Sequence, residues 1–395
     1  MGNVYPPHDM RGGYELTWRS SVLHLRAGGH DVRVLASDYR AEGVEGELDV
    51  DVHRELRWYW RDHEFPRHSW RERLAVERHN AAAFDRHLED FEPDTVAWWQ
   101  MGGMSLSLID RARRAGLAAV GVIGDEWLRW GPRADAWLKP FQGRPRLAAA
   151  AERLSGLPAR VDFDGAGTWL FNSGVTLRKS LDEGLVLGRA QIAHPGIETG
   201  LFPPAPPQPW RWRLLYLGRL DSRKGVDLAI EALGLLPGGA TLVIQGSGGE
   251  GPYLRSLHQR AEDLGVADRV TFSTEPRERV PAIYAAADAL LFPVQWDEPW
   301  GLVPLEAMAV GRPVVATGTG GSAEYLVHER NCLVFEPRDS ADALAATLRR
   351  LAGDERLRAQ LREEGFATAA RYTETGYNEA IERALLAASS TRQKL

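Results

Sequence analysis

The chain of 395 residues has little of several features that would assign it to a function class at once. Its one cysteine, Cys332, excludes an internal disulfide, and it lacks an apolar run of the ~18 residues that a membrane-spanning helix needs. A formal net charge of −6 argues against a nucleic-acid-binding protein, which would carry a basic face. With no secretory leader recognisable, these absences predict a cytoplasmic protein without nucleic-acid partners.

Lysine is also scarce: it occurs only at positions 139, 179, 224 and 394, although Lys and Arg together number 48. Hydrophobic residues make up 44% of the chain, which is too long for one core, so two domains of roughly 200 residues are expected. The turn over 194–198 and the Pro-rich stretch 203–209 indicate a hinge. We therefore expect an N-terminal domain over 1–200 and a C-terminal domain over 201–374.

The hydrophobic pattern alternates between strand and helix periods in both halves, which is typical of an α/β protein with parallel sheets. Only Asn3 and Val4 stand where a full apolar first strand is expected, so that strand is either very short or clipped. Strands are predicted over 32–35, 95–99, 118–123, 168–171, 191–194, 212–217, 241–245, 270–272 and 286–294. Helices are predicted up to about residue 27 and over 70–88, 105–115, 174–181, 302–310, 340–372 and about 375–388.

Two carboxylates lie eight positions apart in the run 297–309. Glu298 falls in a loop after a buried strand, at the end of the strand where open α/β sheets bind ligands, and Glu306 falls inside the next helix. The N–H groups of Gly301 and Leu302 would face an anion, and Glu306 can accept hydrogen bonds from a vicinal diol. An anion beside a diol describes a nucleotide, although each glutamate taken alone could be an ordinary surface carboxylate.

A second pattern follows the strand that ends at Gly218. Arg219 and Lys224 are two cations five positions apart at a strand-to-helix turn. Arginine can bind a diphosphate through two hydrogen bonds and lysine binds it as a point charge. As an isolated pattern this is equally well a charged surface turn.

The run E-P-W-G-L-V-P-L-E-A-M-A over 298–309 resembles the E-x7-E signature of family-4 retaining glycosyltransferases of the GT-B fold. The motif G-R-L-x-x-x-K-G over 218–225 resembles the pyrophosphate site of that family. It precedes the E-x7-E signature in this chain, as it does in the family. The resemblance implies two facing Rossmann-like domains with an intervening cleft, and a C-terminal helix over about 375–390 that crosses back to the first domain. It implies retaining transfer of a sugar from a nucleotide-diphospho-sugar, UDP-sugar before GDP-sugar, to a hydroxyl of a small molecule or glycan.

The resemblance also implies roles for individual residues. Arg219 and Lys224 would hold the leaving diphosphate, so that neither a metal nor a cofactor is needed. Glu298 would bind the sugar hydroxyls and Glu306 the ribose. The candidate catalytic residues are Glu298, Arg219, Lys224 and Asp125. The implied donor-binding set is Gly12, Gly13, Gly218, Arg219, Lys224, Gly246, Gly248, Glu275, Glu298, Trp300, Gly301, Leu302, Val303 and Glu306.

The first domain departs from the family pattern at one point. The family's turn often reads His-Asp-x-Trp, with the histidine near the reacting sugar, but here Gly124 precedes Asp125 and Trp127. Gln100 or Asp125 would then face the acceptor. The segment 53–90, rich in Arg, His and Trp, is either a solvated helix with half-buried aromatics or an insertion that stacks on the acceptor.

Several other patterns in the sequence give less indication of function. The glycines of 246–251 have the spacing G-x-G-x-x-G, but Pro252 follows at once and this is the second turn of its domain, which disfavours a dinucleotide site. His63, Glu64 and His68 do not form a zinc motif, because the spacing is too long and Pro66 would break the helix. The turn Thr319–Gly321 is a further expected anion contact.

Three other functions stay open. A nucleotide-sugar epimerase or a phosphorylase could use the same fold, and so could a catalytically silent nucleotide-sugar-binding module. An epimerase would turn over without an acceptor alcohol, a phosphorylase would use phosphate as acceptor, and a silent module would bind nucleotide without turnover. We expect a monomer or a homodimer.

Overall fold

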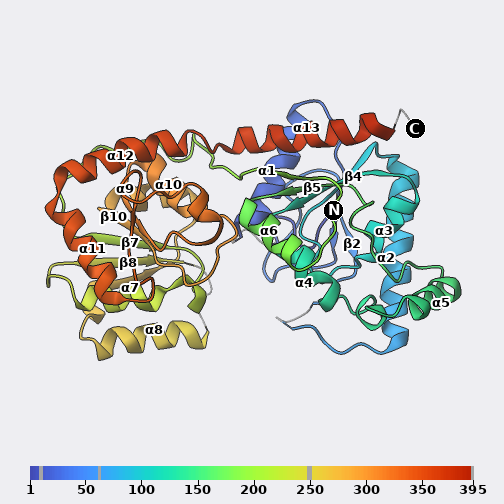
Figure 1. Cartoon of the computed structure of the whole chain (residues 1–395), viewed down its shortest axis with the longest axis horizontal. Coiled ribbons are helices and arrows are strands. Elements are labelled where there is room, and N and C mark those ends of the chain that lie inside the picture. Colours follow the sequence, from blue (N-terminus) through green and yellow to red (C-terminus); the bar gives the residue numbers. More distant parts are fainter. Residues whose placement is uncertain (9–11, 61–63, 247–250, 393–395) are drawn as a thin grey trace. The chain divides into compact units, whose positions relative to one another are not determined.

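The computed structural model describes residues 1–8, 12–60, 64–246 and 251–392, and in it the chain divides into two compact units (Figure 1). The first unit comprises residues 1–194 together with 377–395, and the second comprises 195–376. Both are α/β with parallel strands, as the alternation of periods predicted. Every described helix is too short or too polar to cross a membrane.

The first unit contains two parallel sheets, one of two strands in the order β1-β2 and one of four in the order β3-β4-β5-β6. The apolar runs 118–123 and 168–171 form strands with the bounds that the sequence predicted. The strands are β1 Val34–Ser37, β2 Val52–Leu56, β3 Thr95–Trp98, β4 Ala118–Ile123, β5 Thr168–Phe171 and β6 Ala190–Ile192. The helices are α1 Gly13–Ala27, α2 Trp70–Phe91, α3 Ser107–Arg114, α4 Trp127–Ala134, α5 Pro145–Ser155, α6 Gly174–Asp182, the 3₁₀ helix Lys139–Phe141, and α13 Glu374–Arg392 from Tyr377 onward.

The short strand predicted at Asn3 and Val4 is not a regular strand, but residues 1–3 hydrogen-bond to the chain on both sides. On one side they pair with β1 and on the other with the end of β3, so they join the two sheets. The bonds run from the N–H groups of Gly2, Asn3, Ser37 and Trp99 to the carbonyl oxygens of Leu35, Gln100, Asn3 and Met1, respectively, over 2.7 to 3.3 Å.

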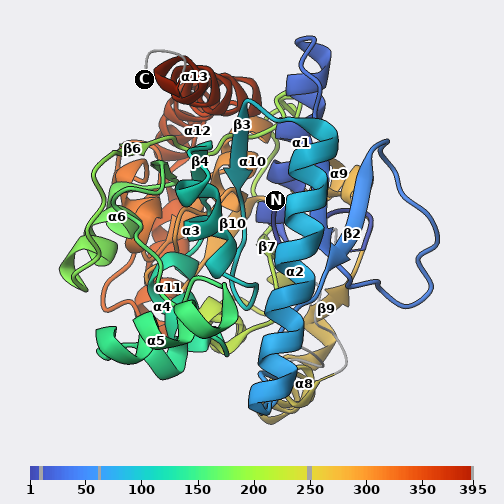
Figure 2. The same cartoon turned by 90° about the vertical axis from the view of Figure 1, so that its right-hand side faces the viewer.

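Helices cover both faces of the first unit because alternate side chains of its strands point to opposite sides. Val122 and Leu170 pack with Trp18 of α1 and Ile381 of α13 in one buried cluster. The neighbouring residues Ile123 and Phe171 pack with Phe84 of α2 and Ile109 of α3 in another. The helix α2 is seen along its length in Figure 2. The C-terminal helix thus belongs to the first unit, as the resemblance implied.

The second unit has one six-stranded parallel sheet in the order β12-β11-β10-β7-β8-β9. Its strands are β7 Arg213–Leu217, β8 Thr241–Gln245, β9 Val270–Ser273, β10 Ala289–Phe292, β11 Val314–Ala316 and β12 Leu333–Val334. Its helices are α7 Val226–Gly234, α8 Pro252–Asp263, α9 Val280–Ala286, α10 Val303–Val310, α11 Ala341–Gly353 and α12 Glu355–Ala369, with 3₁₀ helices over Ser222–Lys224, Ala267–Arg269, Arg277–Arg279 and Gly320–Glu324.

The strand order reverses between β7 and β10, which are neighbours in the sheet although they are far apart in the chain. The apolar run 286–294 contributes only the four residues of β10, because its first residue still belongs to α9 and Pro293 has no N–H to continue the ladder. Ligands of open α/β sheets bind outside the carboxyl ends of the strands at such a reversal. The turns after β7 and β10 are therefore the place to look for a site.

Candidate active site

The turn after β7 brings Arg219 and Lys224 to the carboxyl edge of the sheet. The Tyr216 hydroxyl donates to the main-chain oxygen of Arg219 over 2.9 Å, and Lys224 ends the 3₁₀ helix that leads into α7. Gly225 follows with φ 67° and lies so close to β10 that a Cβ would overlap the carbonyl oxygen of Pro293. Only glycine combines this dihedral with this approach, so the turn lies directly against the segment that carries Glu298.

Lys224 and Glu298 form the centre of the site. The ammonium group of Lys224 contacts Oε2 of Glu298, and the indole N–H of Trp296 donates to the same oxygen over 2.9 Å. The two charged side chains are 19% and 14% exposed, so the pair is shielded from solvent but still reachable. The ammonium nitrogen also lies 5.5 Å from the centre of the Trp296 ring. Both sequence-predicted charges are thus brought together and oriented by one tryptophan.

The turn Thr319–Gly321 supports this loop, and the N–H of Gly321, one of the groups expected to contact an anion, is engaged by the main chain. The N–H of Gly321 donates to the carbonyl oxygen of Glu298 over 2.7 Å, and the Thr319 hydroxyl donates to that of Trp296 over 2.9 Å. Gly320 has φ 63°, and a Cβ there would overlap the main chain of Glu298. These contacts hold the Glu298 loop against the sheet.

Glu306 lies in the first turn of α10 and is 5% exposed. The Tyr284 hydroxyl donates to its Oε2 over 2.8 Å, and a guanidinium nitrogen of Arg277 lies 3.7 Å from its Oε1. Burial raises the pKa of Glu306, against the opposing charge of Arg277 and the hydrogen bond from Tyr284. One carboxyl oxygen is therefore held by a fixed donor and the other faces an arginine whose side chain is 40% exposed.

The start of α10 is where the sequence predicted N–H groups that bind an anion. Gly301 has φ 88°, and the N-cap residue Leu302 makes no side-chain cap, so Val303 opens a helix whose first N–H groups have no capping side chain. Trp300 is placed differently from Leu302: its indole is 3% exposed and donates to the carbonyl oxygen of Pro195 over 2.9 Å. Any donor contact of Trp300 would come from its main chain.

The ends of β8 and β9 complete the edge of the sheet. A Cβ at Gly246 would overlap the carbonyl oxygen of Gly218, so the two glycines pass in close contact. The Gln245 amide donates to the carbonyl oxygen of Glu275 over 2.9 Å, while the side chain of Glu275 is exposed. Gly248, also predicted to bind the donor, lies outside the described residues.

The first unit holds the remaining predicted residues. Asp125 follows β4, and its carboxylate accepts hydrogen bonds from the N–H of Trp127 over 2.9 Å and from the side-chain amide of Gln100. Burial raises the pKa of Asp125 to about 6.

Gly12 and Gly13 form the start of α1, where a Cβ on Gly12 would overlap the carboxylate of Glu15. The carboxylate of Glu15 therefore lies beside the two glycines at the start of α1.

The absence of a histidine at Gly124 has a physical cause in the neighbouring aromatic ring. The ring of Tyr14 packs on Gly124 so closely that a Cβ there would overlap it. The Tyr14 hydroxyl donates to the carbonyl oxygen of Val122, and the Asn172 amide donates to that of Gly124 over 2.8 Å. Tyr14 thus occupies the space beside Asp125 that a longer residue at 124 would need.

Four side chains of the site were missed by reasoning from the sequence: Tyr14, Arg277, Tyr284 and Trp296. Tyr284 lies 22 positions from the carboxylate it binds, and no local pattern connects them. Trp296 stands two residues before Glu298, and a tryptophan so close to a predicted ligand in a loop was the one available signal. Arg277 and Tyr284 contact Glu306, Trp296 contacts Glu298, and Tyr14 packs on Gly124 beside Asp125. None of the four belonged to a motif.

Comparison with known proteins finds a family model that matches this part of the chain. Residues 205–368 match the family model of the glycosyl transferases, group 1. That segment contains Arg219, Lys224, Glu298 and Glu306. It covers less than half of the chain, and all of it belongs to the second unit.

Two curated relatives match over a similar stretch. The D-inositol 3-phosphate glycosyltransferase of Mycobacteroides abscessus is 36% identical over 174 residues, which are 40% of this chain and 39% of that protein. The GDP-mannose-dependent alpha-(1-6)-phosphatidylinositol monomannoside mannosyltransferase of Mycobacterium tuberculosis is 37% identical over 177 residues, 39% of this chain and 45% of that protein. The chain thus spans less than half the length of these relatives.

A solved structure extends the likeness to the whole chain. The sucrose-phosphate synthase of Thermosynechococcus elongatus superposes with a TM-score of 0.70 over 98% of this chain and 96% of that one, at 19% identity. At this identity the likeness concerns the fold alone. The fold is GT-B, with two Rossmann-like units, as the resemblance implied.

Proposed function

We propose that the chain is a retaining, metal-independent glycosyltransferase of family 4 that transfers a sugar from a nucleotide-diphospho-sugar to an acceptor hydroxyl. The observation that carries the proposal is the placement of Arg219, Lys224 and Glu298 at the strand-order reversal of the second unit. This is where a ligand of such a sheet binds, and it lies within the segment that matches the group 1 glycosyl transferases.

The donor diphosphate would be bound by three kinds of positive group. The guanidinium of Arg219 and the ammonium of Lys224 supply full charges, and the uncapped N–H groups at the start of α10 supply the partial charge of a helix terminus. Charge accumulates on the diphosphate as the sugar leaves. Preorganised donors at that position are worth roughly 3 to 4 kcal/mol each in the transition state.

Glu298 would bind the sugar hydroxyls and Glu306 those of the ribose. In the described structure Lys224 is paired with Glu298, so we expect that pair to separate when donor binds. The ammonium would then take a phosphate oxygen and the carboxylate would turn to the sugar, still held by the Trp296 indole. Glu306 would offer Oε1 to the ribose if Arg277 moves aside, while Tyr284 keeps Oε2 in place.

The candidate donors and acceptors are taken from the family resemblance and from the names of the relatives. UDP-sugar is the first candidate donor from the family resemblance, and GDP-mannose, which the mannosyltransferase relative is named for, is the second. The names of both relatives contain inositol, so an inositol-containing small molecule or glycan is the first acceptor class to assay. Asp125 would help to position the acceptor hydroxyl.

The experiment that tests the proposal is thermal stabilisation of the purified chain by UDP, GDP, ADP and dTDP, followed by an assay with the corresponding sugars. Ligand at about 100 times its dissociation constant adds roughly 2.7 kcal/mol of stability, which a melting curve resolves. We expect one nucleotide to shift the transition and its sugar to be transferred with retention. No shift with any nucleotide would overturn the assignment.

A further inference from the structure

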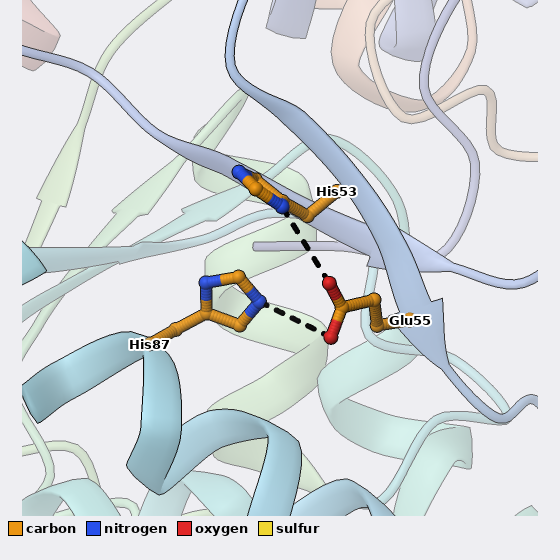
Figure 3. A group of neighbouring side chains, drawn as sticks. All are labelled: His53, Glu55 and His87. Carbon is orange, nitrogen blue, oxygen red and sulfur yellow. Dashed lines mark ion pairs between the residues drawn. The ribbon is translucent and has the colours of Figure 1, made fainter. Parts of the chain in front are cut away.

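Three side chains that the proposed reaction does not use converge in the first unit (Figure 3). His53 and Glu55 are two positions apart on β2, so they point to the same face of the strand. His87 comes from α2, which packs against that face. None of the three belonged to a motif recognised in the sequence.

Their separations fit a common metal ion. Nδ1 of His53 lies 3.5 Å from one oxygen of Glu55, and Nε2 of His87 lies 3.4 Å from the other. All three ligand atoms lie within 4.8 Å of one another. Ligands about 2.0 to 2.1 Å from a tetrahedral zinc ion are roughly 3.4 Å apart, so an ion between these atoms would draw the most widely separated of them together by at most about 1.4 Å.

The hydrogen bonds of His53 prepare it to be a ligand. Its Nε2 lies 2.7 Å from Oδ1 of Asp51, which fixes the proton on that nitrogen. Nδ1 then faces the second carboxylate, that of Glu55, over 3.5 Å, and a metal ion at this nitrogen would take the place of a second proton on the ring. A carboxylate on the far nitrogen of a metal-binding histidine is the usual supporting contact at such sites.

His87 offers the third ligand atom. Its side chain is 11% exposed, and its Nε2 lies 3.4 Å from Oε2 of Glu55. A metal ion would replace the proton that Nε2 carries toward that carboxylate. Burial lowers the pKa of His87, against the opposing charge of Glu55. Burial opposes ionisation of Glu55, but Arg86 and His87 outweigh it and lower its pKa.

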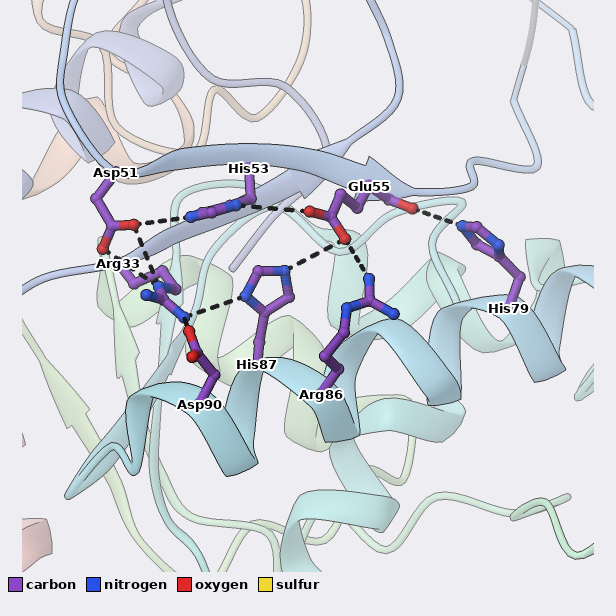
Figure 4. A network of polar contacts seen from close by, with 8 residues as sticks. All are labelled: Arg33, Asp51, His53, Glu55, His79, Arg86, His87 and Asp90. Atoms are coloured by element: carbon purple, nitrogen blue, oxygen red, sulfur yellow. Dashed lines mark hydrogen bonds and ion pairs between the residues drawn. The ribbon is translucent and has the colours of Figure 1, made fainter.

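The charges around the three residues come from β2 and α2 and from the residues just before β1 and β2 (Figure 4). Three carboxylates, of Asp51, Glu55 and Asp90, outnumber the guanidinium groups of Arg33 and Arg86. Arg33 is engaged with both aspartates, and one of its nitrogens lies 3.5 Å from Nδ1 of His87. Arg86 contacts Glu55 directly, but its side chain is 62% exposed and can turn to solvent.

We propose that His53, Glu55 and His87 bind one divalent transition-metal ion, best Zn²⁺, which fastens β2 to α2. Two imidazoles and a carboxylate are borderline ligands that suit zinc and not magnesium. Water would complete the coordination, and His87 also lines a cavity of about 670 Å³ together with Arg33 and Asp90. The ion would act on the stability of this unit and takes no part in the proposed transfer.

The test is a titration of the metal-free full chain with Zn²⁺ and with Co²⁺, followed by calorimetry and by the visible spectrum of bound cobalt. We expect one ion per chain, a tetrahedral cobalt spectrum and a higher melting temperature, with no effect of Mg²⁺. His53→Ala, His87→Ala and Glu55→Gln should each weaken binding at least tenfold. His79→Ala is the matched control, because His79 contacts only the main-chain oxygen of Glu55, over 2.8 Å, and should bind as the wild type does.

The Arg86→Ala variant distinguishes a metal site from a network of hydrogen bonds and ion pairs without a metal. Removal of a guanidinium from Glu55 frees a ligand oxygen and should tighten Zn²⁺ binding several-fold. Asp51→Asn should weaken it about tenfold, as loss of a supporting carboxylate does. Absence of saturable binding in the wild type, or equal binding by the His87→Ala and His79→Ala variants when circular dichroism shows both folded, would overturn the proposal.

Discussion

The ammonium group of Lys224 and the carboxylate of Glu298 contact each other across 74 positions of sequence. They meet because β7 and β10 are neighbours in the sheet, so the turns that follow these strands share one edge. A cation held by an acid is ready to exchange that acid for a phosphate. The pair therefore links the fold of the second unit to the chemistry that we propose.

Removal of either cation should disable transfer. We expect Arg219→Ala and Lys224→Ala each to lower kcat/KM about a hundredfold or more, because each would stabilise charge on the leaving diphosphate. The matched control is Arg223→Ala, one residue away, whose guanidinium pairs with Asp221 over 2.7 Å and should cost less than about threefold. Steady-state kinetics measure these effects. Near-normal turnover of Lys224→Ala with an unchanged melting curve would contradict the assignment of Lys224 to the diphosphate site.

The ribose contact should appear in nucleotide affinity. Glu306→Ala is expected to weaken binding by about 1.5 to 3 kcal/mol, the usual cost of a lost hydrogen bond to a charged group. Tyr284→Phe removes only the donor that holds Oε2, and its main effect should be a loss of about 1 to 3 kcal/mol of stability, because a buried oxygen loses its partner. Calorimetric titration with nucleotide and chemical denaturation measure the two effects separately. Unchanged affinity in Glu306→Ala would remove that residue from the site.

Sequence alone could predict the elements whose limits are set locally. The runs 118–123, 168–171 and 241–245 are apolar segments bounded by turns, and each forms a strand with those bounds. These bounds are confirmed because the information lies within a few residues. The motif order also predicted that Lys224 and Glu298 share one site, and the two side chains are in contact, but their roles in a donor site stay a prediction.

The remainder depends on contacts between distant segments. The indole of Trp300, a residue predicted to bind the donor, packs with Tyr325 and Tyr372, a contact that no spacing reveals. The first residues hydrogen-bond to β1 and β3 without forming a regular strand, which follows from where those strands lie. His53 and His87 face each other only because α2 packs on β2.

Gly124 should be intolerant of any side chain while Tyr14 is present. We expect Gly124→Ala to destabilise the chain by about 1 to 3 kcal/mol, because its Cβ would overlap the Tyr14 ring and force a shift in a packed region. In the Tyr14→Ala background the same substitution should cost much less. A double-mutant cycle of denaturation free energies checks the coupling. Additive effects of the two changes would mean that the glycine is there for another reason.

Asp125 should make stability fall with rising pH. Burial raises its pKa to about 6, above the ~3.9 of an unfolded aspartate, so the folded state holds the proton more tightly. The stabilisation that comes from this proton is complete below about pH 4 and is lost as pH rises through about 6, a change of roughly 2 to 3 kcal/mol.

Asp125→Asn keeps an oxygen that can accept from the N–H of Trp127 but cannot ionise. We therefore expect this variant to lose the pH dependence and to be more stable than the wild type above pH 6, while transfer is reduced if the carboxylate positions the acceptor. Denaturation at pH 5 and pH 7.5 measures the stability term independently of activity. An equal pH dependence in the two proteins would show that the carboxyl of Asp125 titrates no differently in the folded chain, and the role proposed for its carboxylate would then have to rest on transfer assays alone.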